Sequence, residues 1–333
     1  VLNVTESEQT FIFDQVPCRP IPSLLREFSA PVKLNYAWSD EQLTFLMRHA
    51  SNAFSRWDAA QSLLANYIRL NVSRYQQKQP LSVPMHVVDA FRGVLLDEKL
   101  DPMLASQILT LPSENEIAEL FDIIDPTAIA AVRESMTRTM AKEMADEWLA
   151  VYHANHAPQY RIEHADMGKR ALRNVCLHYL AFNDEAPADK LVQAQFRQAD
   201  NMTDSLAALS AAVEAQLPVR DDLLTQFDNR WHQDGLVMDK WFVLQATSPA
   251  ADVLTRVREL LQHRSFSLNN PNRLRSLVGA FAASNPSAFH AEDGSGYRFL
   301  PEILADLNTR NPQVAARVIE PLIRLKRYDA KRQ

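Results

Sequence analysis

Glycine is scarce in this sequence: only 6 of the 333 residues are glycine. That is about 2%, against a usual share of about 7%. Tight hairpins, β-bulges and glycine-rich phosphate-binding loops depend on glycine, because it alone adopts positive φ angles at little cost. The shortage therefore argues against a β-rich protein and against a nucleotide-binding loop. It predicts that most of the chain is helical.

Cysteine and long apolar runs are also lacking. The two cysteines, Cys18 and Cys176, lie far apart, so they form neither a CxxC pair nor a disulfide framework. Such thiols are typical of a reducing compartment, and we expect a cytoplasmic protein. No run approaches 18 uninterrupted apolar residues and no signal peptide opens the chain, so the sequence predicts no membrane span.

Positive charge does not dominate the sequence. The sequence has 35 Lys and Arg residues and 41 Asp and Glu residues, which gives a formal net charge of −6. The most basic stretch is the tail RLKRYDAKR (324–332), which we interpret as a solvated helix end, where cations are favoured. We therefore expect no nucleic-acid partner.

The short motifs of common catalytic sites are missing too. The sequence has no HExxH, no GxSxG, no Walker loop and no dinucleotide fingerprint. His153 and His156 are three residues apart, but a metal site needs a further ligand, so we interpret them as solvated. EDGSG (292–296) follows no predicted strand and lacks GK[ST], so it predicts a turn. We expect no catalytic residue and no metal site.

The residue pattern changes near residue 37, from strand-like before it to helical after it. VLNV, TFIFDQV and APVKLNYAW are rich in β-branched and aromatic residues, which is typical of strands. Two or three strands do not form a stable domain alone. We therefore predict that residues 1–37 are the last strands of a β domain, and that the chain, which opens at Val1 instead of Met, is a piece of a longer protein.

From residue 38 onward the pattern is helical. A capping residue followed by proline, which suits a helix start, recurs at Asp101–Pro102, Asp125–Pro126, Ser248–Pro249, Asn270–Pro271, Asn285–Pro286 and Asn311–Pro312. The irregular spacing excludes tetratricopeptide and ankyrin periods. The sequence therefore predicts that residues 38–333 form a mainly α fold, an irregular α-solenoid of short antiparallel helices. Four tryptophans should fill its core: Trp57, Trp148, Trp231 and Trp241.

Two arginines lie where a helix disfavours them. LNNPNRLRSLVGAFAAS (268–284) predicts a helix that begins at Asn270–Pro271. Arg273 and Arg275 fall in its first turns, where the helix dipole disfavours each cation by about 0.3–1 kcal/mol. On a helical wheel they lie about 100° to either side of Leu274, so they point in different directions. Small residues share the side of Arg275, namely Gly279, Ala282 and Ala283.

Several longer stretches carry a resemblance to a known family: EFSAPVKLNY, LMRHASNAFSRWDAAQSL, LFDIIDP, LVMDKWFVLQATSP, NPNRLRSLVGAFAASNP and FHAEDGSGYRFL. They closely resemble the C-terminal region of the bacterial aminopeptidase N family, which are zinc-dependent alanyl aminopeptidases of the gluzincin group. The resemblance spans essentially the whole chain. It implies a parent enzyme with an N-terminal β domain, a thermolysin-like zinc domain, a small β-sandwich and a HEAT-like helical superhelix. Residues 1–37 then match the end of a truncated sandwich, and residues 38–333 match the superhelix.

The resemblance also implies a role. In the family the helical domain caps the active-site cavity of a metallopeptidase that removes N-terminal amino acids from peptides, limits access and contacts the peptide. The family's HExxH zinc site and substrate-amine motif belong to the thermolysin-like domain and do not occur in this sequence. The implied cofactor is therefore zinc in the parent enzyme and none in this piece, which we expect to be inactive alone. The implied partners are peptide substrates and the missing domains of the same chain.

Three positions are implied to bind the peptide. The residues that match Arg275, Gln313 and Arg317 face the cavity in the family. Gln313 and Arg317 are four apart, so one helix face carries both, and a guanidinium can hold a carbonyl or terminal carboxylate by two hydrogen bonds. The alternative is an ion pair with an acid on a neighbouring helix, such as Asp306 or Glu302.

A different class of function is also open. A free-standing α-solenoid can be a scaffold that binds protein partners on its concave face. The strand-like residues 1–37 argue against this alternative, because a scaffold does not need the end of a β domain.

Overall fold

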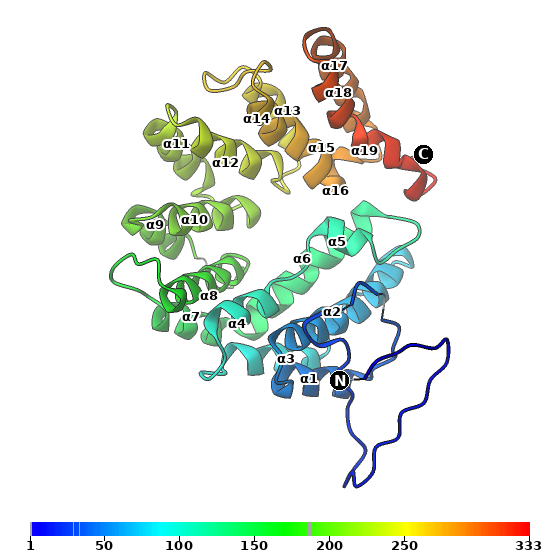
Figure 1. The fold of residues 1–333 in the computed structure, drawn as a ribbon. Helices are drawn as coiled ribbons and strands as arrows, with labels where there is room; N and C mark the ends of the chain where they lie inside the picture. The colour runs from blue at the N-terminus through cyan, green and yellow to red at the C-terminus, as the bar shows by residue number, and fades with distance from the viewer. Residues whose placement is uncertain (1, 29, 33, 186–187) are drawn as a thin grey trace.

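The computed structural model describes residues 2–28, 30–32, 34–185 and 188–333, and Figure 1 shows a curved succession of short helices. The predicted mainly helical solenoid is confirmed. The first helices are α1 (Asp40–His49), α2 (Ala53–Gln76), α3 (Met85–Leu95), α4 (Pro102–Leu109), α5 (Glu114–Ala118) and α6 (Pro126–Glu143). The middle ones are α7 (Ala145–Ala154), α8 (His164–Ala181), α9 (Asp189–Gln198), α10 (Met202–Glu214), α11 (Arg220–Trp231), α12 (Gly235–Ala246) and α13 (Val253–Leu260).

The last part of the chain has shorter elements and one π turn. They are α14 (Pro271–Leu274), the π turn η2 (Arg275–Gly279), α15 (Ala280–Ser284), α16 (Pro286–Phe289), α17 (Ser295–Arg310), α18 (Pro312–Val318), α19 (Glu320–Ile323) and the 3₁₀ turn η3 (Arg324–Arg327). A further 3₁₀ turn, η1, spans Arg26–Phe28 near the start of the chain.

The described residues of segment 1–37 contain no strand of the predicted β domain. In 2–28, 30–32 and 34–37 the only regular element is η1, and apolar side chains such as Ile12 and Phe13 are exposed. A strand requires a second strand to receive its backbone hydrogen bonds, and the described residues offer none. Val1, Ser29 and Lys33 lie outside the described residues. The segment still touches the helices, because the Trp38 indole donates to the carbonyl of Pro22 at 3.3 Å.

We propose that the boundary between the two parts lies at residues 37 and 38. Deleting residues 1–36 is expected to leave the helical circular-dichroism signal and its melting transition nearly unchanged, because this segment contributes few side chains to the core. Deleting residues 38–76 is the control, since α2 supplies the fully buried Leu63 and Leu64 and its loss should unfold the helices. A cooperative loss of helix on the first deletion would place the boundary elsewhere.

Most of the predicted capping residues begin helices. Asp101, Asp125, Asn270 and Asn311 each accept hydrogen bonds from backbone N–H groups of the helix that follows. The prediction at Ser248–Pro249 is wrong in position, because α13 begins only at Val253. Asn285 precedes α16 but does not cap it: its amide donates instead to the carbonyls of Ala246 and Ser248, at 3.0 and 2.9 Å. The Asn285 side chain therefore links the α15–α16 connection to the end of α12 inside the core.

One apolar core runs through the stacked helices. Trp148 and Trp241 are buried as predicted, whereas Trp57 and Trp231 are half-buried and pack against the core. Trp148 stacks on Tyr179 of α8, with ring centroids 4.3 Å apart and nearly parallel planes. Most of the helices bury side chains against their neighbours, as in other solenoids.

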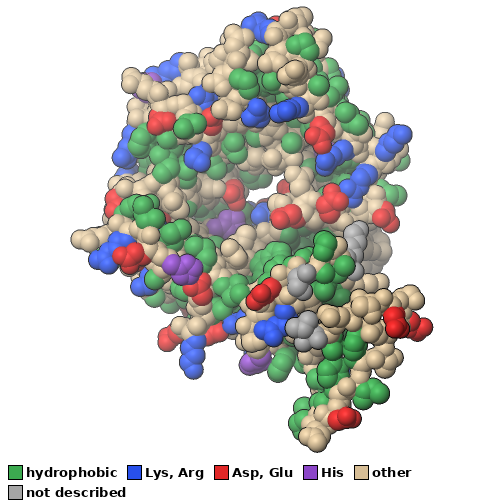
Figure 2. Space-filling view, viewed as in Figure 1, with side chains coloured by type: hydrophobic (Ala, Val, Ile, Leu, Met, Phe, Trp, Pro, Cys, Tyr) green, Lys and Arg blue, Asp and Glu red, His purple; other side chains and the backbone are tan. Residues whose placement is uncertain are grey.

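The solenoid curls until α5 and α6 meet α15, α16 and the C-terminal residues. Figure 1 shows α5 and α6 lying beside α16 and the C-terminus, and α16 contacts α6. The Asn115 amide of α5 donates to the carbonyl of Ala283 at 2.8 Å, although the two residues are 168 positions apart. Figure 2 shows the face of this ring hollowed near its centre. The ring brings residues that are 168 positions apart in the sequence into one site.

Candidate functional site

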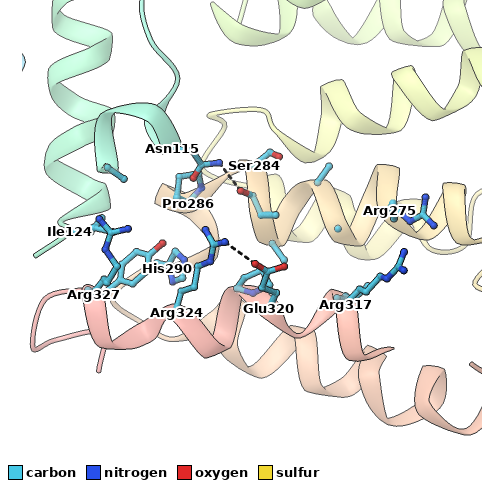
Figure 3. A pocket seen from close by; sticks show the side chains of 18 of the residues that line it. Asn115, Ile124, Arg275, Ser284, Pro286, His290, Arg317, Glu320, Arg324 and Arg327 are labelled. Atoms are coloured by element: carbon cyan, nitrogen blue, oxygen red, sulfur yellow. Dashed lines mark hydrogen bonds and ion pairs between the residues drawn. The ribbon is translucent and has the colours of Figure 1, made fainter. Parts of the chain in front are cut away.

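A pocket of about 820 Å³ lies where the two ends of the ring meet. One wall comes from η2, α15, α18 and α19, and the other from α5 and the residues before α6 (Figure 3). Its size falls within the usual range of ligand sites, about 300–1,000 Å³. Apolar and small residues make up much of the lining, including Ile124, Val243, Gly279, Ala280, Ala282, Ala283, Val314, Val318 and Pro321.

The π turn brings Arg275 to this pocket. Asn270 caps α14 by accepting from the backbone N–H groups of Asn272 and Arg273, at 3.0 and 3.4 Å. The helix then widens, because the N–H of Ala280 bonds to the carbonyl of Arg275, five residues back. Such turns are rare and often mark functional positions. Arg275 is exposed, lines the pocket together with Gly279, and donates to the Asn272 side chain at 3.3 Å.

Arg273 points the other way, into the protein. It is 7% exposed, forms an ion pair with Asp239 of α12 and donates to the carbonyl of Gly235 at 2.6 Å. The hydroxyl of Ser276 donates to the same carboxylate at 2.9 Å. The two arginines diverge as the helical wheel predicts. Arg273 connects two helices, and Arg275 faces solvent.

The structure brings together two of the three residues predicted to bind peptide. Arg317 of α18 lines the pocket, and Figure 3 shows its side chain at the same end as that of Arg275. Gln313, one turn earlier on α18, is exposed and is not among the lining residues. The sequence placed Gln313 and Arg317 on one helix face, but the residues of α18 that line the pocket are Val314, Arg317 and Val318.

The alternative ion-pair partners are engaged elsewhere. Asp306 binds Arg310 at 2.9 Å, and Glu302 binds Arg258 at 2.8 Å. In the part of the chain that the structure describes, no acidic side chain forms an ion pair with Arg275 or Arg317. Arg275 uses one donor for the Asn272 side chain, and its other donors, with those of Arg317, are available to a ligand.

The other charges of the pocket are largely neutralised. Arg324 binds Glu320 at 2.7 Å, and Nη1 of Arg327 contacts both carboxylate oxygens of Glu119, at 2.9 and 3.0 Å. Burial, assisted by the nearby Arg332 charge, lowers the pKa of His290 to about 4, so this imidazole is neutral at pH 7. The positive charge available to a ligand is therefore concentrated at the end that carries Arg275 and Arg317.

Sequence reasoning missed several other residues that line the pocket. Asn115, Glu119, Ile124, His290, Arg324, Arg327 and Tyr328 also line it. The basic tail was interpreted as a solvated helix end, yet Arg332 is 4% exposed. No local signal in the sequence marks these positions, because contacts such as that of Arg327 with Glu119 join residues about 200 positions apart.

The arrangement is suited to binding oxygen-rich groups. Arg275 and Arg317 form no ion pair with the acidic side chains that the structure describes, and a guanidinium beside small apolar residues can hold a carboxylate or a carbonyl by two parallel hydrogen bonds. In the described ranges no group of three or more His, Cys, Asp or Glu side chains is placed to hold a metal ion, and His153 and His156 are exposed. No described helix has the length and apolar character needed to cross a membrane.

Comparisons with known proteins cover the whole chain. Residues 40–333 match the model of a domain of unknown function (DUF3458_C) described as ARM repeats, and residues 1–37 match one (DUF3458) described as an Ig-like fold. Aminopeptidase N of Escherichia coli (strain K12) is 72% identical over all 333 residues, and aminopeptidase N of Haemophilus influenzae is 51% identical. Aminopeptidase N of Caulobacter vibrioides is 33% identical over 329 residues. The chain spans 38% of the length of each of these relatives.

A solved structure shares the fold. A crystal structure of Legionella pneumophila aminopeptidase A in complex with aspartic acid matches with a TM-score of 0.85 and 29% identity. The match covers 96% of this chain and 38% of that one.

Proposed function

The chain belongs to the family of ARM-repeat domains found in the C-terminal region of bacterial aminopeptidase N, and from this we propose that it caps the active-site cavity of a metallopeptidase. In this role the helical ring limits access of substrates and contacts the peptide whose N-terminal residue is removed. The match along the entire chain to aminopeptidases supports the proposal.

One observation carries the peptide-binding part of the proposal. Arg275 and Arg317 are both exposed, point to one end of the pocket and lack an acidic partner within the described residues. A helix dipole disfavours Arg275, and Arg273 already links α14 to α12, so the fold does not need a second cation there. We assign the two guanidinium groups to a carbonyl or the terminal carboxylate of a bound peptide. Gln313 lies one turn away and is proposed to contact a longer peptide.

The chemistry belongs to another part of the proposed enzyme. The described residues do not fit a metal site, because they hold no cluster of three ligands. We therefore propose that zinc is held by the part of the enzyme outside this chain, and that this chain alone does not hydrolyse peptides. A cytoplasmic location is part of the same proposal, supported by the free and widely separated Cys18 and Cys176.

Alanine at Arg275 or Arg317 tests the proposal in the full-length enzyme. We expect kcat/KM for tri- and tetrapeptides to fall about 10- to 100-fold, because a charge-assisted hydrogen bond contributes about 1.5–3 kcal/mol. Hydrolysis of a small aminoacyl amide, which does not reach the helical wall, should barely change. The measurement is the ratio of the two kcat/KM values, taken beside the melting temperature.

The matched control is Arg197→Ala. Arg197 is an exposed arginine of α9 that does not line the pocket, and its loss should leave the ratio unchanged. An unchanged ratio in the Arg275 and Arg317 variants, together with a melting temperature several degrees lower, would show that these arginines serve the fold.

The scaffold alternative has less support. The relatives that match over 98–100% of the chain are named aminopeptidases. A protein-interaction role would require a different observation, such as a stable complex formed by this chain with the pocket blocked.

A further inference from the structure

One carboxylate of α12 contacts residues on both sides of Arg275 in the sequence. Arg273 forms its ion pair with Oδ1 of Asp239, and the hydroxyl of Ser276 lies 2.9 Å from the same oxygen. We define Arg273, Asp239 and Ser276 as the bracket. We propose that Asp239 is a positioning residue: through the bracket it fixes the π turn η2 so that Arg275 points into the pocket, and it thereby sets the affinity for a peptide that it does not touch. This role rests on the proposed function, which assigns Arg275 to the peptide.

The bracket and Arg275 lie on opposite sides of one helix. Arg273 and Ser276 are three residues apart, so their side chains share a face. Arg275 follows Arg273 by two residues, which is about 200° round a helix. Its side chain lines the pocket, where Figure 3 shows it beside that of Arg317. Because both faces belong to the same turn, holding the bracket in place sets the direction in which Arg275 points.

The bracket is buried and joins η2 to a neighbouring helix. Arg273 and Ser276 are 7% and 6% exposed, and the side chain of Asp239 is 20% exposed. Arg273 also donates to the carbonyl of Gly235 at 2.6 Å, so it binds α12 at two points. Hydrogen bonds between charged groups are about twice as strong as neutral ones. The bracket therefore holds the start of η2 firmly against α12.

Asp239 also acts on the shape of the turn. The Ser276 hydroxyl lies 2.9 and 3.1 Å from the carbonyls of Asn272 and Arg273 in the preceding turn. A hydroxyl has one proton to donate, so its bond to Asp239 competes with a bond to either carbonyl. Bonds of the second kind often bend a helix. Loss of the carboxylate would leave only this second kind and alter the direction of the chain at Arg275.

Arg275 has little other support. In the part of the chain that the structure describes, its exposed side chain makes one hydrogen bond to another side chain, that of Asn272 at 3.3 Å. Asn272 belongs to the same helix start and moves with it, so this bond does not fix Arg275 relative to the pocket. Val243, one turn after Asp239 on α12, is itself a lining residue. The bracket therefore links Arg275 to a helix that forms part of the pocket.

Asp239→Ala in the full-length enzyme tests the proposal. We expect the KM for tri- and tetrapeptides to rise about 3- to 10-fold, which corresponds to one ordinary hydrogen bond. The kcat should stay unchanged, because a displaced guanidinium loses binding that the substrate and the transition state share. The KM for a small aminoacyl amide should also stay unchanged. Asp239→Asn keeps an oxygen for Arg273 and Ser276, so it should restore most of the peptide affinity although it removes the charge.

Ser276→Ala provides a second test if Asp239→Ala fails to fold. It leaves the ion pair between Arg273 and Asp239 intact, and we expect the KM for peptides to rise about 2- to 5-fold. Glu147→Ala is the matched control. Glu147 of α7 binds Arg92 of α3 at 2.8 Å, has a side chain that is 28% exposed and does not line the pocket. Its loss should lower the melting temperature and leave the KM for peptides unchanged.

Combination with Arg275→Ala separates positioning from a purely structural role. Once Arg275 is absent, Asp239→Ala should have no further effect on the KM for peptides. An equal rise in KM with and without Arg275 would overturn the proposal. So would an unchanged KM in both Asp239→Ala and Ser276→Ala while Arg275→Ala raises it, and the proposed function would then still stand. If Arg275→Ala itself has no effect on peptides, the proposed function fails and the role of Asp239 fails with it.

Discussion

Replacing Arg273 by alanine is expected to lower the free energy of unfolding by about 3 kcal/mol. Removing one partner of a buried ion pair costs about 3–5 kcal/mol, because it leaves the other charge without compensation. We expect the lower end of this range, since Asp239 keeps a fifth of its side-chain surface in solvent and still accepts from Ser276. Urea denaturation followed by helical circular dichroism measures the change.

Arg275→Ala is the control for this experiment, because the two arginines share one helix start. Arg275 is exposed and opposes the helix dipole, so its loss should leave stability unchanged or raise it by about 0.3–1 kcal/mol. A large loss of stability at Arg275, or none at Arg273, would contradict the division of roles between the two.

Gly296→Ala is expected to destabilise the chain by about 3 kcal/mol or more, because overpacking a core site costs about 1–3 kcal/mol and more when backbone must move. A Cβ at Gly296 would lie 2.2 Å from the carbonyl oxygen of Phe289 and 2.9 Å from its carbonyl carbon. Neither atom belongs to a flexible side chain, so α16 and α17 would have to separate. The melting temperature and the near-ultraviolet circular dichroism of the surrounding aromatic residues report the change.

Gly279→Ala provides the opposite case on the neighbouring helix. There a Cβ would lie 3.6 Å from the Cβ of Arg275, an ordinary contact. The change should raise stability by about 0.5–1 kcal/mol, because alanine is preferred over glycine inside a helix. If both substitutions cost the same, close approach of the backbone is not what requires glycine at 296.

The helical part could be predicted because its signals are local. A capping side chain acts on the first turn of its own helix, so a helix start can be predicted from a few neighbouring residues. The capping residues of this kind are Asp101, Asp125, Asn270 and Asn311. The strands expected in residues 1–37 could not be judged in the same way. A strand depends on a partner, and a β-like pattern does not say whether the chain contains one.

Only part of the candidate site could be predicted from the sequence. The helical wheel separated Arg273 from Arg275, because that depends on spacing within one helix. The wheel could not say that Gln313 is absent from the residues that line the pocket, nor that Arg327 would bind Glu119. Those facts depend on the closure of the ring, which brings together residues 208 positions apart.

That separation in sequence also fixes when the pocket comes into existence during synthesis. Glu119 leaves the ribosome 208 residues before Arg327. At a synthesis rate of about 5–20 residues per second, Arg327 emerges roughly 10–40 s after Glu119. Long-range contacts of this kind raise contact order and form late. The helices can stack one after another as they emerge, but a ligand that needs both Glu119 and Arg327 in place can bind only after Arg327 has emerged and reached Glu119.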